Sequence, residues 1–247
     1  MLVLALDTTG RAGSLALFRD RHPLAVRVGD ARRTHGQRLP GDLVSLLDEH
    51  GLQPRDVDLF AVAAGPGSFT GLRVGIATIQ GLALVTGRPV VAVSALEALA
   101  YAVRERAGDR LIGAWIDAQR REVFGALYEP VRTPETPDAD PSLGLAERAA
   151  PSVGTADQIL ERWVEPAGHA PVLFAGDGAH LYRGAILQVR HASLVEVLAE
   201  TPPLAAALAN IAMTRAAEGR AGRPHAIVPV YVRRPDAELA REKREPS

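Results

Sequence analysis

The sequence predicts an α/β protein with a layered core of sheets and helices, built from two similar halves. Short β-type runs alternate with segments of helical period, and residues 2–106 follow the order βββαβαβα. Each half opens with a strand ending in an aspartate, Asp7 or Asp117, followed by a turn and a second strand. Parallel strands joined by helical crossovers require a layered arrangement. A duplication explains the recurring order, and a chance likeness of two α/β stretches is the alternative.

Turn and cap residues place the elements of the first half. A polar turn at residues 8–12 separates two β-type runs, as in a hairpin. Thr34 is a suitable cap for a helix that Gly51 ends, and a second helix begins at Ser68 or Phe69 and ends at Gly87. The expected elements are strands at 2–7, 13–19 and 25–28, a helix at 34–50, a strand at 59–63, a helix at 68–87, a strand at 89–93 and a helix at 94–106.

The second half repeats this order less clearly. Its expected elements are strands at 111–117 and 122–128, a weaker stretch, a helix at 155–163, a strand at 172–175, a helical segment at 178–187, a short element at 196–200 and a helix at 203–218. Four prolines between residues 130 and 141 predict a loop or insert over residues 130–150. We expect an N-terminal lobe at 1–106, a C-terminal lobe at 107–232 and a flexible tail at 233–247.

Composition excludes several classes of chemistry. The 247 residues contain no cysteine, so thiolate nucleophiles and thiolate metal sites are absent. The only lysine is Lys243, so the folded body lacks the lysine of a Walker A loop or a Schiff base. The net charge of −1 argues against a protein that binds nucleic acid by itself, without a partner protein. We expect a cytoplasmic protein without a signal peptide, and the apolar stretch 74–87 is shorter than a bilayer span of about 20 residues.

The turn after the first strand is a candidate ligand site. Asp7, Thr8 and Thr9 lie at the carboxyl end of the strand, where open α/β sheets bind ligands. The carboxylate could orient a metal-bound water, and the hydroxyls could hold a phosphate. Alternatively, Asp7 only caps the turn.

A glycine-rich block follows the strand at 59–63. Its spacing matches neither the dinucleotide fingerprint nor a Walker A loop, but Gly65, Gly67 and Ser68 precede a helix whose free amides could hold an anion. Gly67, Gly71 and Gly75 are four residues apart and form one stripe. Because an interior helix glycine costs about 1 kcal/mol relative to alanine, the stripe indicates close approach of another backbone. That backbone could be a helix of the same chain or of a partner protein.

The second half offers weaker candidates. Arg120 and Arg121 lie between two strands just after Asp117 and could meet a phosphate or be solvated. No histidine pair has the spacing of a metal site, so we expect no metal.

Five blocks give the chain a family resemblance. They are, in chain order, Asp7-Thr8-Thr9, Gly65 to Gly75, Ile116 to Phe124, Gly176 to Ala179 and Val228 to Arg233. Together they resemble the bacterial TsaB (YeaZ) family of tRNA threonylcarbamoyladenosine biosynthesis. The resemblance implies an actin/hexokinase/Hsp70-like (ASKHA, RNase H-like) fold of two duplicated lobes. It also implies a non-catalytic subunit that dimerises with its catalytic paralogue TsaD and, with TsaE, supports transfer of threonylcarbamoyl to N6 of adenosine 37 in tRNAs reading ANN codons.

Two departures from the paralogue's pattern favour the non-catalytic role. Where the paralogue has two metal-binding histidines around a glutamate, this chain has Ala95 and Leu99 around Glu97. Methyl and isobutyl groups cannot coordinate a cation. After Asp117, side chains replace the glycines that wrap phosphate in proteins of this fold, and we expect them to crowd that loop.

The resemblance also assigns residues and partners. The implied interface residues are Leu39, Leu43, Leu46, Gly71, Gly75, Thr78 and Leu82. The candidate nucleotide or anion contacts are Asp7, Thr8, Thr9, Gly65, Gly67, Ser68, Asp117, Arg120, Gly176, Asp177 and Gly178. The implied partners are TsaD in a heterodimer, TsaE in a ternary complex and a second copy when the chain is alone. We expect no cofactor of its own, ATP or ADP only in the assembled complex, tRNA only through the complex and no membrane. The alternatives are an ATP-dependent enzyme of the same fold, a metallopeptidase-like protein and a direct tRNA-binding module.

Overall fold

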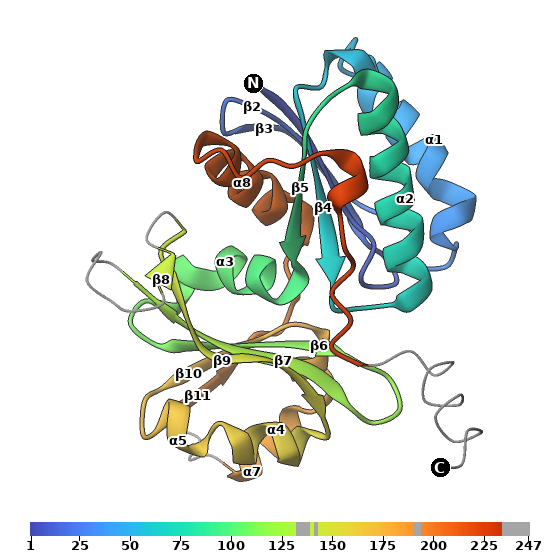
Figure 1. The fold of residues 1–247 in the computed structure, drawn as a ribbon. Coiled ribbons are helices and arrows are strands. Elements are labelled where there is room, and N and C mark those ends of the chain that lie inside the picture. Colours follow the sequence, from blue (N-terminus) through green and yellow to red (C-terminus); the bar gives the residue numbers. More distant parts are fainter. Residues whose placement is uncertain (132–138, 141–142, 190–193, 234–247) are drawn as a thin grey trace, which may run out of the picture.

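Two lobes, each built on one mixed sheet, make up the protein (Figure 1). The computed structural model describes residues 1–131, 139–140, 143–189 and 194–233. The first sheet lies in the upper part of Figure 1 and the second in the lower part.

The first sheet has the strand order β3-β2-β1-β4-β5. Strands β1, β2 and β3 are antiparallel, and β4 and β5 continue the sheet parallel to β1. Helices α1 and α2 lie side by side over one face (Figure 1). The elements are β1 (Leu2–Asp7), β2 (Ser14–Arg19), β3 (His22–Val28), α1 (His35–Asp48), the 3-10 helix η1 (Pro54–Asp56), β4 (Leu59–Gly65), α2 (Phe69–Thr86) and β5 (Val90–Ser94).

The second sheet repeats this topology. Its order is β11-β10-β6-β7-β9-β8, so β9-β7-β6-β10-β11 corresponds strand for strand to β3-β2-β1-β4-β5, with the same parallel and antiparallel pairs. The predicted duplication is therefore confirmed. The elements are β6 (Leu111–Asp117), β7 (Val123–Pro130), β8 (Ala139–Asp140), β9 (Leu145–Gly154), α4 (Ala156–Arg162), α5 (Val164–Ala167), β10 (Val172–Ala175), α6 (Asp177–Leu181), α7 (Arg183–Val189) and β11 (Val195–Val197).

Two helices join the lobes. Helix α3 (Ala95–Ala107) packs on the second sheet, and α8 (Leu204–Ala217) packs on α3 and on β1, β2 and β4 of the first. Their apolar side chains belong to one core cluster that also contains residues of both sheets.

The C-terminal part of the chain thus differs from the predicted division into lobes. Residues 204–232 were expected in the second lobe, but α8 covers the first sheet and the 3-10 helix η3 (Pro224–Ala226) packs on α2. Hydrophobic pattern predicts helix α8 but not the sheet on which it packs.

Local signals explain the helix bounds. The Ser68 hydroxyl accepts a hydrogen bond from the Gly71 N–H at 3.2 Å, and Gly87 ends α2 in the left-handed region with φ of 69°. Ser94 and Thr155 cap α3 and α4 in the same way. The helices predicted at 68–87, 94–106 and 155–163 are confirmed.

Strand β9 was not predicted. Its burial does not alternate along its length, so no period of two marks it. It occupies residues 145–154 and therefore overlaps the predicted insert at 130–150. Residues 132–138 and 141–142 of that insert, and residues 234–247 of the predicted flexible tail, lie outside the described residues.

Helix α2 meets the length and apolarity of a membrane span. It has 18 residues and, among the described residues, it is the one helix that does so. The expectation from sequence rested on the shorter uncharged stretch 74–87. One face of α2 packs on the first sheet and another on η3, as in the core helix of a globular protein.

Candidate functional site

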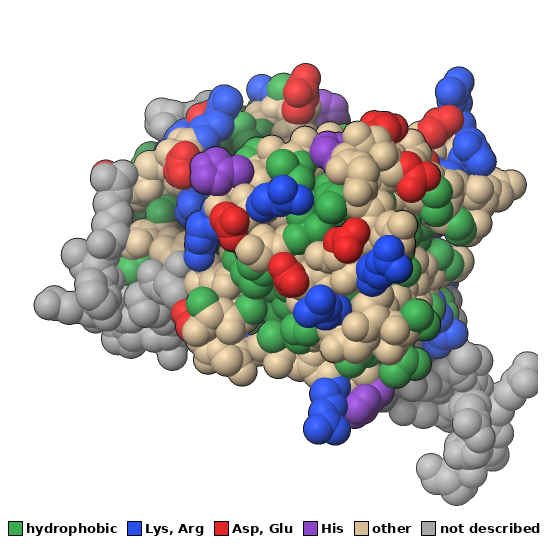
Figure 2. Space-filling model, turned by 90° about the horizontal axis from the view of Figure 1, so that it is seen from above, with side chains coloured by type: hydrophobic (Ala, Val, Ile, Leu, Met, Phe, Trp, Pro, Cys, Tyr) green, Lys and Arg blue, Asp and Glu red, His purple; other side chains and the backbone are tan. Residues whose placement is uncertain are grey.

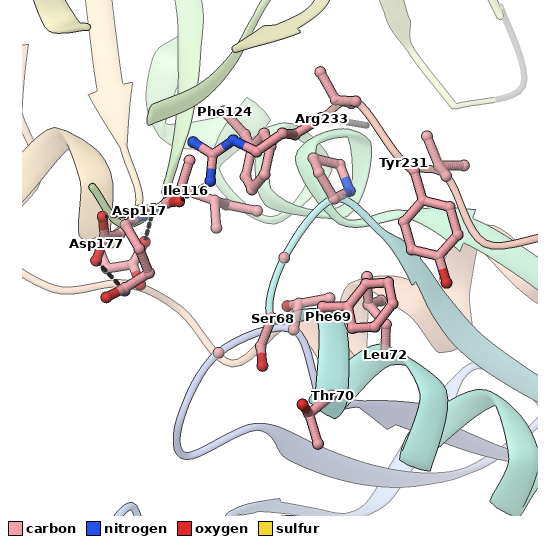
Figure 3. Close-up of a pocket in the computed structure, with 18 of the residues that line it drawn as sticks. Ser68, Phe69, Thr70, Leu72, Ile116, Asp117, Phe124, Asp177, Tyr231 and Arg233 are labelled. Carbon is pink, nitrogen blue, oxygen red and sulfur yellow. Dashed lines mark hydrogen bonds between the residues drawn. The ribbon is translucent and has the colours of Figure 1, made fainter. Parts of the chain in front are cut away.

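A cavity of about 710 Å³ lies between the lobes (Figure 3). The first lobe supplies the turn after β1 and the start of α2, and the second supplies the ends of β6 and β10 with the turn that follows β6. Residues 230–233 complete the lining. Of the predicted contact residues, six line it: Thr9, Gly67, Ser68, Asp117, Arg120 and Asp177. Asp7, Thr8, Gly65, Gly176 and Gly178 are buried or lie behind this lining. Binding of a ligand by these residues stays a prediction.

Asp7 is buried and holds its own turn. Its Oδ1 accepts hydrogen bonds from the Thr9 N–H at 2.8 Å and from the Thr9 hydroxyl at 2.6 Å. Burial raises the pKa of the Asp7 carboxyl above its ordinary value of 3.8, and the bonds from Thr9 offset part of that rise. Of the two roles that the sequence left open, the geometry shows the turn cap.

The raised pKa gives Asp7 a measurable effect on stability. As pH rises above 3.8, the Asp7 carboxyl loses its proton in the unfolded chain before it does so in the folded chain. The free energy of unfolding therefore falls with pH until the pH passes the raised pKa of the folded state. In Asp7→Asn the Oδ1 acceptor remains and the charge is gone. We expect the stability of the wild type relative to Asp7→Asn to decrease over this window and then level off, measured by urea unfolding from pH 3.5 to 8.

Asp20 provides a control of opposite sign. It is exposed, and the N-terminal ammonium lowers its pKa by hydrogen bonding and charge. The stability of the wild type relative to Asp20→Asn should therefore increase as pH rises towards 3.8 and then level off. If the Asp7 difference also increases with pH, the burial argument is wrong.

The glycine stripe packs against the same chain. A Cβ on Gly71 would overlap the Thr8 carbonyl oxygen, one on Gly75 would overlap the Thr8 hydroxyl, and one on Gly67 would lie 2.6 Å from the Thr9 Cβ. The Thr8 hydroxyl donates a hydrogen bond to the Gly71 carbonyl at 2.8 Å. The assignment of Gly71 and Gly75 to a partner interface is therefore wrong. The close neighbour is the turn after β1 and not, as the sequence suggested, a helix.

The leucine face of α1 is also internal. Leu39, Leu43 and Leu46 are buried in the apolar cluster of the first lobe, against β1, β2, β4 and α2. Their assignment to a partner interface is wrong, because a regular leucine stripe on a surface helix is the core side. Thr78 and Leu82 are half-buried, and Leu82 packs on this cluster.

The turn after β6 carries strained backbone. Gln119, Arg120 and Arg121 have φ of 59°, 57° and 63°, where residues with a Cβ cost roughly 1–2 kcal/mol each. Asp117 holds the turn, because its carboxylate accepts the Gln119 N–H at 2.9 Å and the Gln119 side-chain amide at 2.5 Å. Residues with side chains thus occupy a turn that favours glycine, and one of them, Arg120, lines the cavity.

Asp177 links two elements of the second lobe. Its carboxylate accepts the N–H of Asp117 at 2.9 Å and of Gly178 at 2.8 Å (Figure 3). Loss of water around it raises its pKa, and the charge of Asp117 adds to the rise. Gly176, with φ of 105°, and Gly178 bring α6 close to β6, since a Cβ on Gly178 would lie 2.9 Å from the Ile116 carbonyl carbon. Asp7, Asp117 and Asp177 all serve backbone turns beside the cavity.

The residues that the family resemblance matches to the paralogue's metal-binding histidines lie in the core. Ala95 and Leu99 are fully buried in the cluster that joins the lobes, and Glu97 forms an ion pair with Arg215 of α8 at 2.5 Å. Within the part of the chain that the structure describes, no three His, Asp or Glu side chains group closely enough to hold a metal ion.

Sequence reasoning missed the role of the C-terminal segment. Residues 228–233 entered only as a motif of the family resemblance, but Tyr231 and Arg233 line the cavity and contact both lobes (Figure 3). No periodicity marks this segment, and only its aromatic and arginine residues distinguish it.

The surface of the first lobe seen from above carries charges of both signs. Figure 2 shows Lys and Arg side chains interspersed with Asp and Glu, and hydrophobic side chains between them. No single-signed patch dominates this face, in keeping with the net charge of −1.

Known proteins match the chain, some of them over nearly all of its length. The family model of TsaD, a tRNA N6-adenosine threonylcarbamoyltransferase, matches residues 29–241. The tRNA threonylcarbamoyladenosine biosynthesis protein TsaB of Bacillus subtilis is 31% identical over 241 residues, which cover 96% of each chain. TsaB of Escherichia coli is 36% identical over 129 residues, 52% of this chain and 55% of that protein.

A solved structure shares the fold. YeaZ from Pseudomonas aeruginosa superposes with a TM-score of 0.75 at 30% identity, covering 93% of this chain and 99% of that one. The two-lobed topology, the strand-end aspartates and the glycine-rich start of α2 thus accompany a match along nearly the whole chain, and the chain belongs to the TsaB (YeaZ) family of tRNA threonylcarbamoyladenosine biosynthesis proteins.

Proposed function

We propose that the chain is a non-catalytic subunit of the machinery that transfers threonylcarbamoyl to N6 of adenosine 37 in tRNAs reading ANN codons. It acts in the cytoplasm by binding TsaD, the catalytic subunit, and the pair then recruits TsaE. The single observation that carries this proposal is an apolar face on the first lobe that its own core does not cover.

That face is the outer side of α1 and α2. Val44, Leu84 and Val85 are exposed by 59%, 73% and 88%. Ala77, Gly81, Leu84 and Val85 are all exposed and follow the helical spacing of one side of α2, opposite the side whose apolar residues pack in the core. A clustered apolar face of this kind marks a protein interaction site.

Small residues make this face suitable for helix packing. Gly41 of α1 and Gly81 of α2 have open space where a Cβ would lie, and Ala77 lies one turn before Gly81. Partner helices can therefore approach closely between the exposed Val44, Leu84 and Val85. These residues, and not Gly71, Gly75 or the three α1 leucines, form the partner face of the proposal.

The match to the TsaD family model supports a paralogous partner. A chain and a partner with the same fold carry equivalent pairs of helices, so the two pairs can pack as four helices around one pseudo-symmetric contact. The same face lets two copies pair when TsaD is absent.

The arrangement of the cavity supports a non-catalytic role. Asp7 and Asp117 accept backbone N–H groups of their own turns, and Asp177 accepts those of Asp117 and Gly178. Ala95 and Leu99 stand where the paralogue binds its metal, and both are buried. In the proposal the chain has no cofactor of its own, ATP or ADP acts only in the assembled complex, and tRNA is bound only through that complex.

Reconstitution tests this proposal. With TsaD, TsaE, tRNA and the threonylcarbamoyl donor supplied, omission of the chain should lower the rate of modification at adenosine 37 by at least roughly tenfold, or about 1.4 kcal/mol. The chain without TsaD should give no modification. An unchanged rate without the chain, or transfer by the chain alone, would contradict the proposal.

A further inference from the structure

The segment that follows α8 runs back along α2 from its C-terminal half towards its start. Gly222 pairs with Val90 of β5 through two backbone hydrogen bonds of 2.9 and 3.0 Å. The Gln80 side-chain amide donates to the Pro224 carbonyl at 3.0 Å, and Ile227 packs on the apolar cluster of the first lobe. The segment is therefore tied to the first lobe at several points.

Near the start of α2 the segment reaches the cavity. The Val230 N–H donates to the Ala64 carbonyl of β4 at 2.7 Å, and the Tyr231 ring lies 5.5 Å from the ring of Phe69. Gly65 permits this approach, because a Cβ there would lie 2.7 Å from the Val230 carbonyl oxygen.

Arg233 then crosses to the second lobe. Its guanidinium donates to the Ala118 carbonyl at 2.8 Å, forms an ion pair with Glu122 and lies 5.6 Å from the centre of the Phe124 ring. Charge-assisted bonds from a planar guanidinium hold their partners in defined geometry. The three partners lie in the turn after β6 and in the strand that follows it.

The lobes are also joined elsewhere, because neither α3 nor α8 contributes a residue to the lining of the cavity. There α3 and α8 share the core cluster with both sheets, and Tyr128 of β7 shares a hydrogen bond with Ser94 at the end of β5. In Figure 1 these helices lie to the left of β4 and β5, and the C-terminal segment descends on the right. The buried side is suited to act as a hinge, and a contact on the far side has the longer lever against rotation of the lobes.

We propose that residues 222–233, which we call the strap, hold the two lobes in one relative orientation. Arg233 is the residue through which the strap binds the second lobe. Because the strap also runs along α2, it keeps the outer face of that helix fixed relative to the second lobe. The proposal concerns the isolated chain and does not depend on the partner.

The cysteine-free sequence allows a direct distance measurement. Val28 of β3 and Val164 of α5 are exposed by 62% and 61%, lie on different lobes and lie outside the strap. Spin labels on cysteines at these two sites report the separation of the lobes by pulsed electron resonance. We expect one narrow distance distribution in the labelled parent and a broader distribution with a longer mean distance in Arg233→Ala.

Two further variants make the result specific. Arg233→Lys keeps the charge facing Glu122 but loses the planar set of guanidinium N–H donors. Its distance distribution should lie between those of the parent and of Arg233→Ala. Arg27→Ala removes an arginine whose partners, Ser45 and Glu49, lie in its own lobe, and should leave the distribution narrow.

Hydrogen exchange provides a second readout. In Arg233→Ala the Val230 amide should exchange roughly tenfold faster, equivalent to about 1.4 kcal/mol, while amides of α3 and α8 stay protected. A distribution and a Val230 exchange rate equal to those of the parent would overturn the proposal, since the α3–α8 contact would then suffice to hold the lobes.

Discussion

Gly71→Ala is expected to lower the melting temperature by roughly 6–12 °C, equivalent to a loss of about 3 kcal/mol in the free energy of unfolding. The added methyl group would overlap the Thr8 carbonyl oxygen, which belongs to the backbone and cannot turn aside. Relief requires α2 to move away from the turn after β1, and that movement would break the bond from the Thr8 hydroxyl to the Gly71 carbonyl. This loss exceeds the gain of about 1 kcal/mol that alanine brings to a helix interior.

Gly81→Ala is the matched control on the same helix. Gly81 is exposed with open space around its Cα, so only the helix propensity changes and stability should rise by about 1 kcal/mol. Thermal and urea unfolding of the two variants measure both effects. Equal shifts for the two substitutions would show that the stripe does not pack within the chain.

The double variant Leu84→Asp with Val85→Asp is expected to weaken binding to TsaD at least a hundredfold, or about 2.7 kcal/mol. Both side chains project from the outer face of α2, and a partner that buries them would have to bury two unpaired carboxylates instead. The folded chain alone leaves both positions in water, so its melting temperature should change little. Titration calorimetry with purified TsaD gives the affinity, and the rate of tRNA modification should fall in parallel.

Val164→Asp is the control for the position of the partner face. Val164 is an equally apolar residue, exposed by 61%, but it lies on the second lobe. Its substitution should leave TsaD affinity within a factor of about two. Undiminished binding by the α2 double variant would remove the outer face of α2 from the proposed interface.

The sequence predicts the secondary structure of this chain well where end signals are local. Ser68 and Gly87 bound α2 because a hydroxyl cap and a left-handed glycine act within one helical turn. The repeated order of strands and helices can be predicted for the same reason, since Asp7 and Asp117 end equivalent strands before equivalent turns. Strand β9 was not predicted because both of its faces are partly covered, so that buried and exposed residues do not alternate along it.

The sequence predicts less well which side of a helix faces a partner protein. Spacing shows that Gly67, Gly71 and Gly75 share one side of α2, but not whether a turn of the same chain or another protein fills it. A stripe of leucines on α1 likewise shows that this helix has an apolar side. In the structure that side packs in the core of the first lobe and does not face a partner. The partner face proposed here lies where exposed residues such as Val85 are apolar on the side opposite the core.

The contacts of the C-terminal strap are set by tertiary structure alone. Val230 and Arg233 meet Ala64 and Ala118, which are far away in sequence, and no local pattern encodes those pairings. The motif of residues 228–233 was visible, but its place across the cavity was not.

The return of α8 to the first sheet has a consequence for synthesis of the protein. Residues of β1, β2 and β4 such as Val3, Ala16 and Ala61 share their core cluster with Leu208 and Ile211 of α8. While the ribosome is still translating the second lobe, that face of the earliest-made strands has no cover from α8. The half of the molecule that is made first is therefore completed last, and until then the apolar face that α8 later covers is open to aggregation.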